Sequence, residues 1–137
     1  MCASPGQITE AITDVAQQAH LVIQPTSPSA DDLHLAVLVF LALERVGIAR
    51  EKLAFALCNV LAANEEKDAG SYLASFGYVV LEGAIPQHLT YRVVMRSGRS
   101  IMETGQKTLD GRAERLMADL LQKAMREGGK KKRGGRA

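Results

Sequence analysis

The chain has 137 residues, of which 47% are apolar, 23% charged and 4% aromatic. This length predicts one compact domain with a core of modest size. The longest apolar stretch, residues 35–43, is far shorter than the roughly 20 residues that span a membrane, and no signal peptide is evident. Two cysteines, Cys2 and Cys58, are too few for a disulfide framework. The composition therefore indicates a cytoplasmic protein with reduced thiols and no membrane partner.

The net charge of +2 is unevenly distributed along the chain. Residues 123–137 contain seven basic residues and one acidic residue, whereas residues 1–122 carry a net charge of −4. A basic, glycine-rich segment of this kind is typical of a solvated tail that can bind anions. We therefore expect a folded domain over residues 1–126 and a basic disordered tail over residues 127–137.

The hydrophobic pattern alternates between helical and extended periods. Ser29 is a candidate N-cap, and Gly47 and Gly77 are candidate helix stops. Gly83 and Pro86 are expected to close the last strand. In chain order, the pattern predicts a helix over 7–19, a strand over 20–24, a helix over 31–46, a strand over 53–61, a helix over 65–76, a strand over 78–81, and helices over 89–97 and 109–125.

Strands that alternate with helices imply a parallel sheet with right-handed crossovers. Three strands make a thin sheet, and the chain opens on a helix instead of a strand. The expected fold class is therefore α/β, with a partial doubly wound parallel sheet. An uncovered edge strand in such a sheet favours self-association or poor solubility.

Several segments together resemble the C-terminal half of the ParA/MinD family of deviant-Walker partition ATPases. The likeness spans residues 2–123 and implies a P-loop NTPase-like fold of the SIMIBI type, lacking its N-terminal strands and P-loop. The segments that carry it are residues 2–6 (CASPG), 21–29 (LVIQPTSPS), 55–60 (FALCNV), 83–86 (GAIP), 91–103 (YRVVMRSGRSIME) and 112–116 (RAERL).

The resemblance implies a nucleotide site with three parts. Asn59 would face the adenine, Ile85 and Pro86 would close over the base, and Pro5 and Gly6 would form the switch turn that senses a terminal phosphate. An asparagine amide can both donate to and accept from a purine edge, and ligands of open α/β sheets lie at the carboxyl ends of the strands. The alternatives are an asparagine that caps its own turn and a plain turn proline.

The phosphate-binding half of that family pattern is missing. The sequence contains no Gly-Lys-Gly-Gly-x-Gly-Lys-[Ser/Thr] loop, and no Walker B aspartate precedes Cys2. ATP and Mg are cofactors of an intact family member, but this chain alone is expected neither to hydrolyse ATP nor to bind a cofactor. A truncated or shifted reading frame is the favoured explanation, with an excised domain or a natural stand-alone form as the alternatives.

Arginines suggest a DNA-binding surface. Arg92 and Arg96 share one face of the helix predicted over 89–97, and Arg99 lies near its end. The resemblance implies that these residues bind DNA nonspecifically, in a strongly salt-dependent manner. A solvated helix face is the alternative. The tail residues expected to add to this contact are Lys130, Lys131, Lys132 and Arg133.

The function implied by the resemblance is that of a ParA-like partition protein in plasmid or chromosome segregation. Such a protein would dimerise, bind DNA on the nucleoid and respond to a centromere-binding partner protein. The alternatives are a non-enzymatic α/β DNA- or protein-interaction module and a conjugative-transfer accessory protein of the same fold. His20, His34 and His88 lie too far apart in the sequence to predict a metal site.

Overall fold

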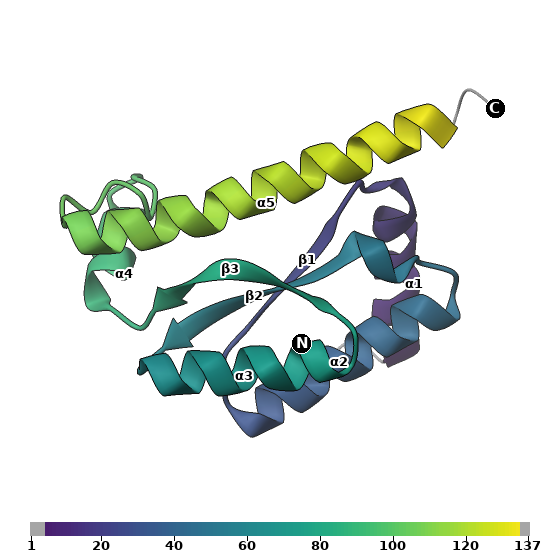
Figure 1. Cartoon of the computed structure of the whole chain (residues 1–137), viewed down its shortest axis with the longest axis horizontal. Helices are drawn as coiled ribbons and strands as arrows, with labels where there is room; N and C mark the ends of the chain where they lie inside the picture. The colour runs from purple at the N-terminus through teal and green to yellow at the C-terminus, as the bar shows by residue number, and fades with distance from the viewer. Residues whose placement is uncertain (1–4, 135–137) are drawn as a thin grey trace.

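The computed structural model describes residues 5–134, and it describes the side chains of residues 10–129 (Figure 1). The three strands form one parallel sheet in the order β1-β2-β3, so the chain is an α/β protein, as its alternating pattern predicted. The elements are α1 (Pro5–Gln18), β1 (Val22–Thr26), α2 (Ala30–Arg45), the 3-10 helix η1 (Arg50–Lys52), β2 (Leu53–Val60), α3 (Ala63–Ser75), β3 (Val79–Pro86), α4 (Leu89–Arg96) and α5 (Lys107–Gly134). Each predicted helix and strand is present, and the largest differences in extent are at β3 and α5.

Helices cover the sheet on both faces (Figure 1). α1, α2 and α3 lie against one face, and α5 crosses the other. On the first face, Phe55 of β2 packs against Phe40 of α2, with ring centroids 4.3 Å apart. On the second face, Ala54 and Ala56 belong to a cluster with Leu116 of α5. β2 is therefore buried on both sides, which explains why its sequence is apolar at nearly every position.

β3 differs from the strand predicted over residues 78–81 because the chain bulges at Gly83 instead of turning. Between Val80 and Ala84, three residues of β3 lie opposite the single residue Ala56 of β2. Gly83 has φ +85°, and a Cβ added there would lie 3.1 Å from the backbone nitrogen of Leu116. Glycine adopts this left-handed conformation without steric cost, so the strand continues through the bulge.

α2 begins as predicted. Ser29 is its N-cap, and the Ser29 hydroxyl accepts a hydrogen bond from the Asp32 backbone N–H at 3.3 Å. Ser27 donates to the Asp32 carboxylate, and the two serine hydroxyls together lower the pKa of Asp32. After the helix, Gly47 has φ +99°, as a glycine just beyond a helix often has.

A polar cluster of Glu44, Arg50 and Tyr78 joins the end of α2 to the start of β3. The Arg50 guanidinium donates to the Glu44 carboxylate, and the Tyr78 hydroxyl donates to the same carboxylate at 2.8 Å. The guanidinium carbon of Arg50 also lies 4.8 Å from the Tyr78 ring centroid. Hydrogen bonding to Arg50 lowers the pKa of Glu44, and burial together with the hydrogen bond to Glu44 raises the pKa of Tyr78 to about 12.

α5 is longer than predicted and runs through part of the expected tail. Its backbone is helical to Gly134, whereas residues 135–137 lie outside the described residues. The helix is fixed at its start by Asp110, whose carboxylate accepts from the backbone N–H groups of Thr104 and Gly105. Within the described part of the chain, no helix combines the length and the apolar character needed to cross a membrane.

Candidate functional site

Asn59 lies near the carboxyl end of the central strand β2. Its φ is +56°, the only positive φ of a non-glycine residue between residues 5 and 134. Asparagine tolerates this conformation better than most residues, but it remains uncommon, and such backbone positions cluster at functional sites. The Asn59 side chain is exposed. Its position matches the expectation that a ligand of this sheet would meet the carboxyl ends of the strands.

β3 brings the other two residues of the expected base site next to Asn59. In the parallel pairing of β2 and β3, Cys58 lies opposite Ile85 and Val60 opposite Pro86, so Asn59 falls between the two pairs. The side chains of Ile85 and Pro86 are half-buried. The backbone of Asn59 therefore lies beside Ile85 and Pro86 at the carboxyl end of the sheet, and the Ile85 side chain packs against the apolar cluster on the α5 side.

The arginines of α4 lie on the outer side of that helix. Tyr91 and Val94 are buried, and the Tyr91 hydroxyl donates to a backbone carbonyl of α5 at 3.0 Å. These inward contacts orient the helix so that Arg92 and Arg96 are exposed, and Arg99 is exposed in the loop that follows. The structure therefore brings the three predicted arginines to the surface in one segment, directly after β3.

Apolar side chains share the arginine surface, which the sequence analysis did not predict. Leu89, Val93 and Met95 are 70%, 51% and 62% exposed. The signal was present in the helical spacing, since Leu89, Arg92, Val93 and Arg96 recur at intervals of three and four residues. The outer side of α4 is therefore mixed apolar and basic.

Six further predicted site residues cannot be placed by their side chains. Pro5 and Gly6 form the start of α1, where only the backbone is described. Lys130, Lys131, Lys132 and Arg133 belong to the last turns of α5, again with only the backbone described. The roles expected for these residues stay predictions.

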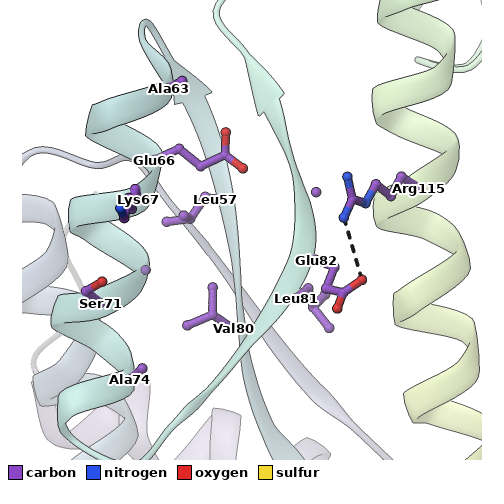
Figure 2. A pocket seen from close by; sticks show the side chains of 12 residues that line it. Leu57, Ala63, Glu66, Lys67, Ser71, Ala74, Val80, Leu81, Glu82 and Arg115 are labelled. Carbon is purple, nitrogen blue, oxygen red and sulfur yellow. Dashed lines mark ion pairs between the residues drawn. The ribbon is translucent and has the colours of Figure 1, made fainter.

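A cavity of about 610 Å³ lies beside the free edge of β3. Figure 2 shows Glu66 of α3 and Arg115 of α5 pointing toward β3 from opposite sides. Arg115 forms an exposed ion pair with Glu82 at 3.8 Å, which contributes little to stability. The Asp119 carboxylate accepts from the Glu82 backbone N–H at 2.7 Å and so satisfies one donor of the unpaired strand edge. None of the predicted site residues lines this cavity, whose shape depends on the spacing of α3 and α5 across the strand.

The described residues include one cysteine, Cys58, and no cluster of metal-ligating side chains. Between residues 5 and 134, no three His, Cys, Asp or Glu side chains gather closely enough to hold a metal ion. Burial raises the pKa of the Cys58 thiol, and this disfavours the reactive thiolate.

The fold is that of an α/β protein with a three-stranded parallel sheet between helical layers, an arrangement compatible with a Rossmann-like fold. Models of known protein families give no match to this chain. No curated protein matches its sequence either.

Proposed function

We propose that this chain acts as a ParA-like partition protein in plasmid or chromosome segregation, with the carboxyl end of its sheet recognising the adenine of a nucleotide and α4 contacting DNA. The observation that carries the proposal is the left-handed backbone of Asn59 beside Ile85 and Pro86. This strained residue lies where an open α/β sheet binds its ligands.

The three residues at the sheet end fit a purine base. The Asn59 amide offers one donor and one acceptor group to the edge of the ring, and Ile85 and Pro86 offer apolar surface to its face. The sequence offers no phosphate loop, so the phosphates of ATP and their Mg²⁺ would depend on an intact family member. By itself the chain would recognise the base weakly.

The DNA contact in this proposal rests on Arg92, Arg96 and Arg99. All three side chains are exposed, so their guanidinium groups are accessible to phosphate oxygens. Contacts of this kind release counterions from DNA and are independent of sequence. The basic end of α5 would extend the surface, and a centromere-binding protein is the expected partner.

Base recognition can be tested by NMR titration of the labelled chain with adenosine, which lacks phosphates that could bind the basic residues. We expect shifts at the Asn59 amide and the Ile85 methyl groups, and their loss in Asn59→Ala. The control is Asn64→Ala, which removes an exposed asparagine from α3. Equal shifts with cytidine, or none at Asn59, would contradict a purine site.

DNA binding can be tested by fluorescence anisotropy on duplexes of unrelated sequence at several salt concentrations. Arg92→Ala with Arg96→Ala should reduce the slope of log affinity against log salt by about two, because two phosphate contacts are lost. Lys67→Ala with Arg115→Ala changes the net charge equally but alters exposed basic residues beside the β3 cavity, away from α4 and from the basic end of α5, so the slope should stay unchanged. Equal losses in both double variants would refute a specific α4 surface.

The second candidate is a non-enzymatic interaction module. It is favoured by the exposed Leu89, Val93 and Met95, because apolar side chains do not bind phosphate groups but are common in surfaces that bind other proteins. If adenosine leaves Asn59 unchanged while the α4 variants weaken binding to a macromolecule, this second candidate becomes the better one. A conjugative-transfer accessory protein of the same fold would behave as the partition protein does in both assays.

A further inference from the structure

α2 is apolar on two opposite sides. One side is buried against the sheet, with Leu33, Val37 and Phe40. The opposite side carries apolar residues at the helical spacing i, i+3, i+4, i+7 and i+11. These residues, which we call the outer α2 stripe, are Leu35, Leu38, Val39 and Ala42 of the helix and its C-cap residue Val46. A helix that is apolar all round is normally covered on both sides, so the outer α2 stripe is suited to a partner.

The outer α2 stripe is well exposed in the single chain. Leu35 is 60%, Leu38 47% and Val46 42% exposed. The surface includes none of the residues proposed above to contact nucleotide or DNA. A partner bound to it would therefore leave the proposed nucleotide and DNA contacts free.

Opposite charges lie at the two ends of the stripe. Asp31, in the first turn of α2, precedes Leu35 by four residues, and Arg45, in the last turn, follows Leu38 by seven. Both side chains are exposed, and neither takes part in an ion pair within the described residues. Two copies of α2 packed antiparallel would place each Asp31 next to the Arg45 of the other copy. Parallel packing would instead oppose like charges.

Side-chain size supports the same antiparallel arrangement. If a two-fold axis passes between Leu38 and Val39, Leu35 of each copy lies opposite Ala42 of the other. A large side chain then meets a small one at both symmetric positions, which allows the helices to interdigitate. A surface complementary to itself in charge and in size is the requirement of a two-fold symmetric interface.

We propose that the chain forms a two-fold symmetric dimer through antiparallel packing of the outer α2 stripe against a second copy of itself. With 16 residues, α2 is about 24 Å long, which is short for an interface when stable ones bury roughly 800 Å² per partner. The dimer is therefore expected to dissociate on dilution, in the micromolar range.

The first test is sedimentation velocity of the full chain over a range of concentrations. The unaltered chain should pass from monomer to dimer, and Leu38→Glu should raise the dissociation constant at least tenfold. Leu121→Glu is the matched control, because Leu121 is a 59% exposed leucine on α5, on the other side of the sheet. Far-UV circular dichroism and urea unfolding should show that both variants are folded. A monomer at every concentration, or equal effects of the two variants, would overturn the proposal.

The second test examines the antiparallel register by charge reversal. Asp31→Arg alone and Arg45→Asp alone should each weaken the dimer, because each creates like-charged pairs at both ends. Combining the two reversals in one chain should restore the dimer, as should mixing the two single variants. A dimer that is indifferent to the single reversals, or a double variant no better than either, would refute this register.

Discussion

Gly83 offers a sharp test of how closely α5 approaches the bulge in β3. In Gly83→Ala, the left-handed backbone with φ +85° costs about 1–2 kcal/mol for a residue that carries a Cβ. The new Cβ would also lie 3.1 Å from the Leu116 backbone nitrogen and 3.4 Å from its Cα, and overpacking of this kind costs about 1–3 kcal/mol. We therefore expect the free energy of unfolding to fall by about 2–5 kcal/mol.

Gly98→Ala is the matched control for this prediction. Gly98 has φ +80°, but an added Cβ there would meet nothing within 4 Å, so only the backbone cost of about 1–2 kcal/mol applies. Urea unfolding followed by far-UV circular dichroism measures both variants. With a slope of about 1–3 kcal/mol per molar urea, the two midpoints should differ by on the order of 1 M. Equal midpoints would show that α5 yields to the added methyl group, and the reasoning from close approach would be wrong.

Three further predictions concern stability. Ser29→Ala removes the N-cap of α2 and should lower the free energy of unfolding by about 1 kcal/mol, measured as a lower urea midpoint. Ser75→Ala is the control, because Ser75 is the last residue of α3 and not an N-cap, and it should cost less. The hydrogen bond from Arg50 that lowers the pKa of Glu44 stabilises the fold at pH values above the ordinary glutamate pKa, and this stabilisation is lost as the pH falls. Glu44→Gln should therefore flatten the acid limb of a plot of urea midpoint against pH. Burial and the hydrogen bond to Glu44 raise the pKa of Tyr78 to about 12, so the protonated phenol stabilises the fold below the ordinary tyrosine pKa, and this stabilisation is lost as the pH rises toward 12. Tyr78→Phe should flatten the alkaline limb of the urea midpoint against pH, and an unchanged limb would contradict the raised pKa.

Much of the fold was predictable from local signals. The apolar run of β2 indicated a strand covered on both faces, and Ser29 indicated the start of α2. The extent of β3 was not predictable in the same way, because a glycine in the sequence is compatible with either a turn or a β-bulge. Only the packing of α5 onto the strand distinguishes the two, and that contact joins residues more than thirty positions apart.

The candidate site was predictable in part. The placement of Asn59 beside Ile85 and Pro86 follows from parallel pairing and could be expected from the order of the strands. The cavity at the free edge of β3 could not be expected, since it depends on the distance between two helices on opposite faces. The sequence shows the residues of α2 as one apolar run. The buried side of that run could be distinguished from the outer α2 stripe only in the structure, which shows which side of the helix packs on the sheet.

The alanines that β2 presents to α5 have a consequence for motion. Because Ala54 and Ala56 offer little apolar surface, fewer buried apolar side chains hold the α5 side of the sheet than the side where Phe40 and Phe55 pack together. Regions held in this way open locally at a lower free energy than the rest of a domain. In hydrogen exchange, we expect the amides of α5 to exchange well before those of β2, with the helix detaching as a unit while the sheet and the helices on its other face stay packed.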